Sequence, residues 1–515
     1  MKSQDIQTSA GAWRSPELPT YLFIYLIIGV LVDPKRSMLG DLDVCWLIRA
    51  GELIWQTGRI PETDIFSFTH YGQPWLLYQW GFEVFIGGLH LLAGLGGVVW
   101  GSGLLIASSY AIFFYFMLRL GIHRGLCIGL VALVMQINSF NWLSRPNTAS
   151  IFFYIFLLLL LEGYRKSPSH RIWFLPLLFI LWTNVHLGFT SGLMVVLLYG
   201  LWARFFPNGF REKEQYRDNR LLVVFILCLL ATLINPYGPR LFTYLWELSR
   251  ATTMNSSICE LHSPDFHSPA HLTLILLFVL LFWFGGFRYP GRGVLFSLVS
   301  ITLVMALFSA RHIPYFSIPA IIHLSYIWVA RKSQTSEVRV PRVDQTKGWG
   351  WGLAFAGVSL VAVVIIGNLR PEFYDFNEKW VPKGATDYLE TVVGKPEPSR
   401  VFTSGGGTQW NDYLLYRLYP RIKVFIDTRF DMYGDAFFKN YLTLVNNLRC
   451  DLTSLDPWKI DFLILQKKEK KDNQNEDRSP LITPMGPPPA LPPWKIVYED
   501  EKTMVYRNLD NAPEN

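Results

Sequence analysis

Long apolar runs separated by short polar loops dominate residues 1–370 of the chain. The charge-free runs cover residues 20–32, 97–118, 151–161, 221–234, 272–284 and 350–366. With their flanks, most of these runs approach the roughly 20 residues that a helix needs to cross a bilayer. Lipid cannot hydrogen-bond to the backbone, so such segments must be helical. The pattern predicts a polytopic α-helical membrane protein with about 11–13 spans.

The count of spans depends on two ambiguous segments. Residues 76–95 contain Gln79, Glu83 and His90, which favours a helix lying along the membrane interface. Alternatively, residues 136–147 dip into the membrane and return on the same side. The first apolar run lacks a small-residue cleavage site behind it, and we interpret it as a retained anchor.

Basic loops indicate the orientation of the spans. Lys and Arg cluster at residues 165–171, 204–220 and 331–347, and positively charged loops tend to remain in the cytoplasm. Counting outward from these loops places residues 35–75 and everything from residue 371 on the extracytoplasmic side. The outer loop at 35–75 also contains apolar positions on one side of a helical wheel at residues 44–55, which predicts an amphipathic helix on the membrane surface.

Composition changes at residue 371 to that of a soluble domain. Short β-prone runs lie at 401–402, 424–426, 462–465 and 496–498, and helical patterns lie at 385–393 and 437–447. We therefore predict an extracytoplasmic α/β domain over residues 371–515. Residues 467–493 combine clustered charge with repeated prolines, which is typical of a flexible insertion.

Composition and charge agree with the membrane class. Apolar residues make up 51% of the chain, charged residues make up 17%, and the mean hydropathy is +0.24. The net charge of +7 could indicate nucleic acid binding, but the basic residues lie in loops between apolar runs. Membrane topology accounts for them, so we expect no nucleic acid partner. The five cysteines include no CxxC pair and predict neither a disulfide framework nor a zinc site.

Two carboxylates one residue apart, Asp41 and Asp43, follow the first apolar run. Acids close to hydrocarbon must face water, a cation or a substrate. Such a pair could coordinate a divalent cation such as Mg²⁺ or Mn²⁺, or one carboxylate could act as a general base while the other orients it. Both uses suit group transfer from a phosphate-bearing donor. The structural alternative is that they cap the helix that follows.

Polar positions at the ends of other spans are further candidates. Arg145 and the pair Arg311 and His312 could hold a lipid phosphate, or they could be snorkelling interfacial charges. His186 could bind donor or acceptor, or could form a hydrogen-bonded hairpin corner. Glu260 could contribute a metal ligand together with neighbouring His and Asp residues, but their spacing matches no dedicated site and a solvated loop is favoured.

Alternating charges mark the C-terminal part of the chain at Asp427, Arg429 and Asp431. On a strand these side chains would point to one face. They could form an internal ion pair, which we favour, or they could face the membrane region and bind the acceptor. The glycines at 405–407 are a weak phosphate-loop signal, for which a turn suffices.

A family resemblance rests on several spaced motifs. They are GDLDVCWLIRAGELIWQTGRIPETDIFSFT at 40–69, PWLLYQWGFE at 74–83, SRPN at 144–147, WTNVHLGF at 182–189, INPYG at 234–238, ICELHSPDF at 258–266, RHIPYF at 311–316, GGTQWNDYLLYRL at 406–418 and VFIDTRFDMYG at 424–434. This combination resembles bacterial proteins of the GT-C superfamily of integral-membrane glycosyltransferases. That superfamily includes the protein mannosyltransferases and the lipid A aminoarabinose transferases.

The resemblance implies a function and a site. It implies a sugar donor linked to polyprenyl phosphate, chemistry at the outer face of a bacterial inner membrane, and Asp41 or Asp43 as the catalytic centre. The acceptor would be an extracytoplasmic glycan, lipid or protein, and membrane lipids would surround the spans. Two other functions remain open from the sequence, namely a transporter or flippase and a non-catalytic assembly protein.

Overall fold

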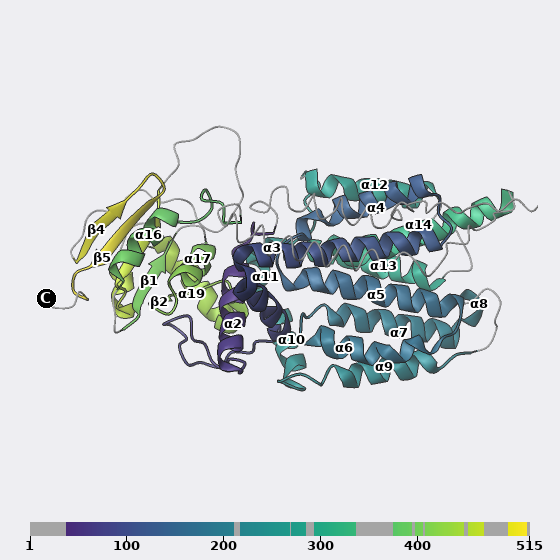
Figure 1. The fold of residues 1–515 in the computed structure, drawn as a ribbon, viewed down its shortest axis with the longest axis horizontal. Coiled ribbons are helices and arrows are strands. Elements are labelled where there is room, and N and C mark those ends of the chain that lie inside the picture. Colours follow the sequence, from purple (N-terminus) through teal and green to yellow (C-terminus); the bar gives the residue numbers. More distant parts are fainter. Residues whose placement is uncertain are drawn as a thin grey trace, which may run out of the picture.

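The structure is a computed structural model, and its fold is mostly helical with a small C-terminal sheet (Figure 1). It describes residues 38–210, 217–267, 269–284, 293–335, 374–393, 397–404, 407–447, 452–467 and 493–511. The expected first and last spans at 20–32 and 350–366, and residues 468–492 of the expected insertion, lie outside the described residues.

Helices that run side by side form one half of the molecule (Figure 1). They are α3 (Trp80–Arg119), α4 (Arg124–Asn138), η1 (Ser139–Asn141), α5 (Pro146–Lys166), η2 (His170–Phe174), α6 (Leu175–Thr183), α7 (Phe189–Phe205), α8 (Pro207–Phe210), α9 (Arg220–Ala231), α12 (Pro269–Trp283), α13 (Gly293–Phe308), η4 (Ala310–His312) and α14 (Ile313–Thr335). Large apolar side chains on α9 and α12 are exposed, which fits a lipid-facing surface.

Three helical stretches in the described part of the chain are long and apolar enough to cross a membrane: α3, α5 and residues Ala310–Arg331. Several shorter apolar helices accompany them, so the total of 11 to 13 spans stays a prediction. The ambiguous segment at 76–95 enters α3, which bends where Ala93 and Gly94 leave helical geometry. Gly94 has a φ of 58° and a ψ of −153°, a conformation that glycine adopts without steric cost.

The amphipathic helix expected in the outer loop is α2 (Asp43–Thr57). Its apolar side is not free for the membrane surface, because Val44, Leu47 and Ile48 are buried against protein. The partners are α3 and α17 (Gln409–Leu418). Gly51 permits the contact with α3, since a Cβ there would lie 1.9 Å from the Glu83 carbonyl oxygen. A sequence pattern shows that one face is apolar but not what covers it.

The C-terminal α/β region comprises residues 374–511 and contains a sheet of five described strands in the order β2-β1-β3-β5-β4. The strands are β1 (Ser399–Thr403), β2 (Ile422–Val424), β3 (Phe462–Gln466), β4 (Trp494–Glu499) and β5 (Thr503–Asn508). β1 pairs in parallel with β2 and β3, and β5 pairs antiparallel with β3 and β4. The four predicted strands are present, whereas β5 was not anticipated.

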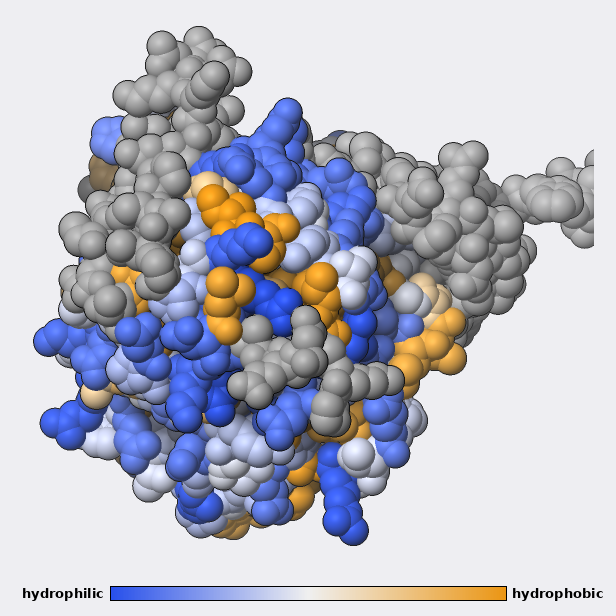
Figure 2. Space-filling view, turned by 90° about the vertical axis from the view of Figure 1, so that its left-hand side faces the viewer, coloured by the Kyte–Doolittle hydropathy of each residue, from blue (hydrophilic) through white to orange (hydrophobic). Residues whose placement is uncertain are grey.

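Both faces of this sheet are covered, as alternating burial requires. Along β3, Phe462 and Ile464 belong to one apolar core and Leu463 and Leu465 to another. The first core includes side chains of α17 and of α16 (Lys383–Val392), and the second includes side chains of α19 (Asp435–Asn447). The end of the molecule formed by this region is mostly hydrophilic (Figure 2).

Segments of the helical half reach across to the α/β region. Val424 N donates to Phe66 O at 3.2 Å and Phe68 N donates to Val424 O at 3.0 Å, so the outer loop lies as an extra edge beside β2. On another side, Asp435 accepts hydrogen bonds from Thr253 Oγ1 at 2.9 Å and from Met254 N at 2.8 Å. The elements of the chain between α9 and α12 in this part of the molecule are α10 (Arg240–Arg250), α11 (Thr252–Ser257) and η3 (Cys259–Leu261). The junction therefore joins the outer loops and the α/β region (Figure 1).

Candidate active site

The carboxylate pair lies at the start of α2. Asp41 stands in the turn before the helix and Asp43 is its first residue. Asp41 Oδ1 accepts a hydrogen bond from Asp43 N at 3.0 Å, so it satisfies one of the free N–H groups at the helix start. The capping role considered from the sequence is therefore real, but it occupies only one oxygen of Asp41.

The other oxygens of the pair face Arg145. Its NH1 group lies 2.9 Å from Asp41 Oδ2, and its NH2 group donates to Asp43 Oδ2. Arg145 has extended backbone angles directly before Pro146, as the proline ring requires, and Pro146 begins α5. The SRPN motif thus sets the guanidinium at the N-terminal end of a long apolar helix, facing the outer loop.

Glu260 and Arg311 complete this group. Glu260 Oε1 accepts from Arg145 NH1 at 2.8 Å, and Glu260 Oε2 lies 3.2 Å from Arg311 NH2. Ser309 Oγ donates to the Glu260 carbonyl oxygen at 3.1 Å, which ties the loop to the approach to α14. The expectation that Glu260 belongs to a solvated loop is wrong, because long-range packing brings it to two arginines that lie far away in the sequence. We call Asp41, Asp43, Arg145, Glu260 and Arg311 the carboxylate–arginine cluster.

Burial and neighbouring charges shift the pKa values of the carboxylates in the cluster. Three carboxylates face two guanidinium groups, which leaves one negative charge in excess. Burial, together with the charges of Asp43 and Glu260, outweighs Arg145 and raises the pKa of Asp41 to about 7. Burial alone would raise the pKa of Glu260 as well, but Arg145 and Arg311 hold it below its ordinary value. Asp41 is therefore poised to exchange a proton near neutral pH.

The cluster remains accessible. The side chains of Asp41, Asp43 and Arg145 are 13%, 16% and 20% exposed, and that of Arg311 is 40% exposed. These side chains are therefore partly open to solvent and to a ligand. The described residues contain no group of three or more His, Cys, Asp or Glu side chains placed to hold a metal ion. Arg145 instead pairs with Asp41, Asp43 and Glu260.

The two candidate histidines differ in their surroundings. His186 lies in the turn between α6 and α7, and its Nδ1 accepts from Gly188 N at 3.1 Å and pairs with Ser150 Oγ at 2.7 Å. Burial and the nearby arginines lower the pKa of His186 to about 3, so the ring is neutral. This matches the hairpin-corner interpretation. His312 follows Arg311 in η4, and its Nδ1 is buried without a hydrogen-bond partner among the described residues.

The alternation of Asp427, Arg429 and Asp431 does not lie on a strand. β2 ends at Val424, and Asp431 belongs to the short helix α18 (Phe430–Tyr433). The strand expectation was wrong because a turn follows the apolar run immediately. Asp427 and Arg429 do form the internal ion pair that we favoured, at 2.5 Å, and Arg429 also reaches Asp64 of the outer loop at 2.7 Å.

Arg429 is almost completely buried, at 1% exposure, and both of its partners are at 0%. Its guanidinium carbon also lies 4.3 Å from the ring centroid of Trp75. This contact therefore joins the outer loop to the C-terminal α/β region. The roles that the sequence suggested for Asp427 and Arg429 in binding a substrate stay predictions.

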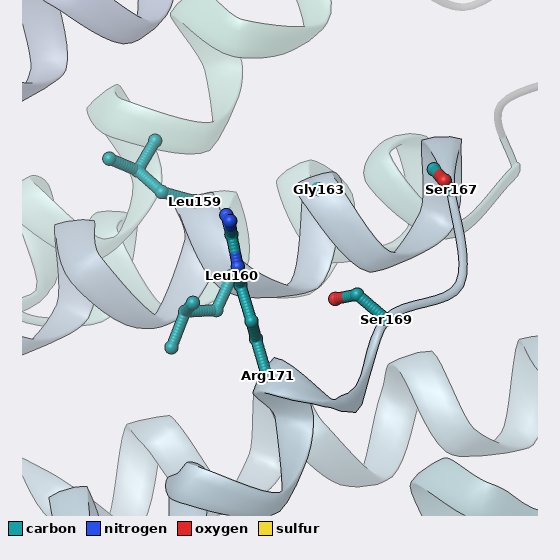
Figure 3. Close-up of a pocket in the computed structure, with 6 residues that line it drawn as sticks. All are labelled: Leu159, Leu160, Gly163, Ser167, Ser169 and Arg171. Carbon is teal, nitrogen blue, oxygen red and sulfur yellow. The ribbon is translucent and has the colours of Figure 1, made fainter. Parts of the chain in front are cut away.

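A pocket of about 310 Å³ lies at the opposite end of α5 from Arg145 (Figure 3). It is lined by Leu159, Leu160, Gly163, Ser167, Ser169 and Arg171. Arg171 is the only charged residue in this lining, and no carboxylate or histidine accompanies it. The pocket therefore lacks a general base and belongs to a different part of the molecule from the cluster.

Residues that the sequence did not single out also come close to the cluster. The charged groups that act on the Tyr78 hydroxyl are Asp431, Arg311, Glu83 and Arg145. Tyr78 packs in turn against Tyr244 of α10, with ring centroids 5.6 Å apart. The aromatic PWLLYQW stretch was a signal for such a contact, but a sequence cannot select which aromatic ring faces the site.

Comparison with known proteins bears on the fold. No protein-family model and no curated protein matches the chain. Among solved structures, the oligosaccharyltransferase of Archaeoglobus fulgidus, tethered with an acceptor peptide, matches with a TM-score of 0.53 at 11% identity. The match covers 87% of this chain and 69% of the archaeal chain.

Two other glycosyltransferase structures match more weakly. ArnT from Cupriavidus metallidurans, bound to undecaprenyl phosphate, has a TM-score of 0.47 at 12% identity, covering 96% of this chain and 99% of its own. The arabinofuranosyltransferase AftD from Mycobacteria has a TM-score of 0.48 at 13% identity. The match covers 87% of this chain and 36% of the AftD chain. These two scores support no conclusion by themselves. The archaeal match shows that this chain shares the overall fold of that oligosaccharyltransferase, as the family resemblance led us to expect.

Proposed function

We propose that this protein is a membrane glycosyltransferase that moves a sugar from a polyprenyl-phosphate donor to an extracytoplasmic glycan, lipid or protein. The observation that carries the proposal is the carboxylate–arginine cluster, in which acids of the first outer loop meet two arginines from the ends of α5 and η4. The archaeal protein with which this chain shares its fold is an oligosaccharyltransferase, which is also a group-transfer enzyme.

Asp41 is the proposed general base. The reaction forms a bond between an acceptor oxygen and the anomeric carbon of the sugar, and it breaks the bond between that carbon and the phosphate oxygen of the donor. The acceptor proton passes to a carboxylate. A pKa of about 7 suits this task, because the group is ionised in half of the molecules at neutral pH and still binds a proton effectively. Asp43 orients Asp41 through its backbone N–H and shares Arg145 with it.

Arg311 and Arg145 are the proposed contacts for the donor phosphate. Arg311 has only Glu260 as an ion-pair partner in the described part of the chain and is 40% exposed, so its remaining N–H groups are free to meet phosphate oxygens. Arg145 adds positive charge where the leaving phosphate gains negative charge. His312 directly follows Arg311 in η4 and is a further proposed contact for the donor, and His186 stays a candidate only as the neutral ring of the α6–α7 turn.

The proposal also includes a possible need for a divalent cation, which can be tested by removing the cation. Mg²⁺ or Mn²⁺ would have Asp41 and Asp43 as ligands, and Arg145 would have to move away from both. Because Arg145 already pairs with both acids, none of the proposed steps uses a metal.

The proposed location is the bacterial inner membrane, with the C-terminal α/β region outside the cytoplasm. The hydrophilic end of the molecule and its contacts with the outer loop support this placement. The basic loops at 165–171 and 204–220 would then face the cytoplasm.

The decisive experiment measures transfer by the full-length protein in liposomes that contain a radiolabelled polyprenyl-phosphate sugar. We expect Asp41→Asn and Asp43→Asn to abolish the labelled covalent product while the proteins remain folded. Asp387→Asn, an exposed acid at 48% exposure in the α/β region, is the matched control and should retain transfer. Full activity of both site variants refutes the assignment, and movement of the intact lipid across the bilayer without product favours a flippase.

A further inference from the structure

An aromatic and acidic group lies beside the proposed reaction site. Its members come from three separate parts of the chain: Tyr78 precedes α3, Tyr244 lies in α10, and Asp431 lies in α18. The two rings are 5.6 Å apart and tilted by 39°, and the Tyr244 hydroxyl donates to Asp431 Oδ2. We call these three residues the Tyr–Asp group.

Each member is held in place by its own surroundings. The backbone next to Tyr78 is fixed because Leu77 N donates to the Tyr237 hydroxyl at 2.8 Å. Asp431 lies two residues after Arg429, which the buried pairs with Asp427 and Asp64 immobilise. The group is therefore positioned by rigid neighbours before any ligand arrives.

The Tyr–Asp group is partly exposed and adjoins the carboxylate–arginine cluster. Tyr78, Tyr244 and Asp431 all retain intermediate exposure although protein surrounds them densely. Arg311 and Arg145 of the cluster act electrostatically on the Tyr78 hydroxyl. The two groups are therefore both partly exposed and electrostatically coupled.

The charges of the two groups separate two kinds of ligand. The cluster offers the guanidinium groups of Arg145 and Arg311, which attract a phosphate. Asp431 has no Lys or Arg in ion-pair contact among the residues that the structure describes, although Arg311 and Arg145 act on the neighbouring Tyr78 hydroxyl. The group therefore lacks the paired guanidinium contacts that a phosphate would use, and it offers a carboxylate instead.

A neutral, hydroxyl-rich ligand fits the Tyr–Asp group. The aromatic rings offer apolar faces for the C–H side of a sugar, and each carries a hydroxyl that can hydrogen-bond. Asp431 is an acceptor for sugar hydroxyls, and hydrogen bonds to a carboxylate are stronger than those between neutral groups. Aromatic faces together with hydroxyl and carboxylate groups are what a protein uses to bind a saccharide.

We propose that Tyr78, Tyr244 and Asp431 form a saccharide subsite that binds the acceptor as a neutral glycan, while the arginines hold the donor phosphate. This inference rests on the proposed function and narrows its acceptor class from glycan, lipid or protein to glycan. It also gives the C-terminal α/β region a direct part in substrate binding, through Asp431.

The competing explanation is that Tyr244 and Asp431 only dock the α/β region onto the outer loops. Asp435 performs that task nearby, where it binds Thr253 and Met254 of α11. Asp435→Asn is therefore a matched control, because it weakens the same junction without touching the Tyr–Asp group. Tyr71→Phe, at an exposed tyrosine of the outer loop, controls for the aromatic change.

The test is glycoside binding by the full-length protein in a detergent without a sugar headgroup, followed by intrinsic fluorescence. The probes are the methyl glycosides of glucose, galactose and mannose. We expect the wild type to bind at least one of them, and Asp431→Asn and Tyr78→Ala to weaken that binding about tenfold, as the loss of a charged hydrogen bond or a ring contact predicts. Asp435→Asn and Tyr71→Phe should bind like the wild type.

The outcomes separate this inference from the proposed function. A wild type that binds none of the glycosides, or variants in the Tyr–Asp group that bind as well as the wild type, overturns the subsite. Equal weakening by Asp435→Asn overturns it too, because docking alone would then explain the effect. Glycoside binding that depends on Asp431 in a protein without any transfer activity supports the subsite and overturns the glycosyltransferase proposal.

Discussion

Replacing Arg429 with Met tests the contact that joins the outer loop to the α/β region. The change keeps an apolar stem but removes a cation that binds Asp427 at 2.5 Å and Asp64 at 2.7 Å. Two carboxylates at 0% exposure are left without a cation, and breaking a buried ion pair in this way costs about 3–5 kcal/mol. Loss of the stacking on Trp75 adds about 0.5–2 kcal/mol.

The assay is unfolding of the full-length protein by SDS in mixed micelles, followed by tryptophan fluorescence. We expect Arg429→Met to lower the free energy of unfolding by about 3.5–7 kcal/mol, the sum of these two losses. Arg417→Met is the control, because Arg417 is 28% exposed and pairs with Asp387 and Glu390 on the surface. Exposed pairs contribute about 1 kcal/mol or less.

Two further measurements separate lost charge pairing from lost packing. Adding Asp64→Asn and Asp427→Asn to Arg429→Met should restore part of the stability, because no buried charge then lacks a partner. In the wild type, burial raises the pKa of Asp64 but Arg429 holds it below its ordinary value, so the pair stabilises the fold above about pH 4 and less as pH falls further. The difference between wild type and Arg429→Met should therefore shrink in acid. A cost no larger than that of Arg417→Met refutes the reasoning.

The remaining expectations concern the site and the packing of α2. The transfer rate should rise with pH and reach half of its maximum near pH 7, because Asp41 acts in its deprotonated form, and a rate independent of pH from 5 to 9 would argue against Asp41 as the base. Glu260→Gln should lower the KM for the lipid donor more than it changes kcat, since it removes a negative charge and frees Arg311 to contact the phosphate, as donor titrations would show. Chelation by EDTA should abolish transfer if the cation is required, and Mg²⁺ or Mn²⁺ should restore it. Gly51→Ala should destabilise the protein by about 1–3 kcal/mol in the SDS assay, because its Cβ would lie 1.9 Å from the Glu83 carbonyl oxygen.

The helical elements and most strands were predictable because their signals are local. Apolar runs identified α3, α5, α9 and α12, and short β-prone runs identified β1 to β4. The missed strand β5 has the same kind of apolar pattern as its neighbours and pairs with β3 and β4. Its place in the sheet depends on long-range pairing, which a local pattern does not contain.

The charges at Asp427, Arg429 and Asp431 alternate as they would on a strand, but they follow β2 and lead into α18. Such alternation is compatible with an extended strand and equally with a segment that leads into a short helix. In the structure Arg429 pairs with Asp64, which lies 365 positions away in the sequence. The ion pair was predictable from opposite charges two positions apart, whereas its third member was not.

The amino-acid sequence alone determined that the chain enters a membrane, where its helices lie, and that Asp41, Asp43, Arg145 and Arg311 stand at polar ends of apolar segments. Those features follow from hydrophobic transfer and from the hydrogen-bonding needs of a backbone in lipid. Only the tertiary structure decided that these ends meet, that Glu260 joins them, and that the α/β region lies close enough to bring Asp431 beside Tyr78. Contacts between residues hundreds of positions apart depend on how whole helices pack, and no local spacing records that packing.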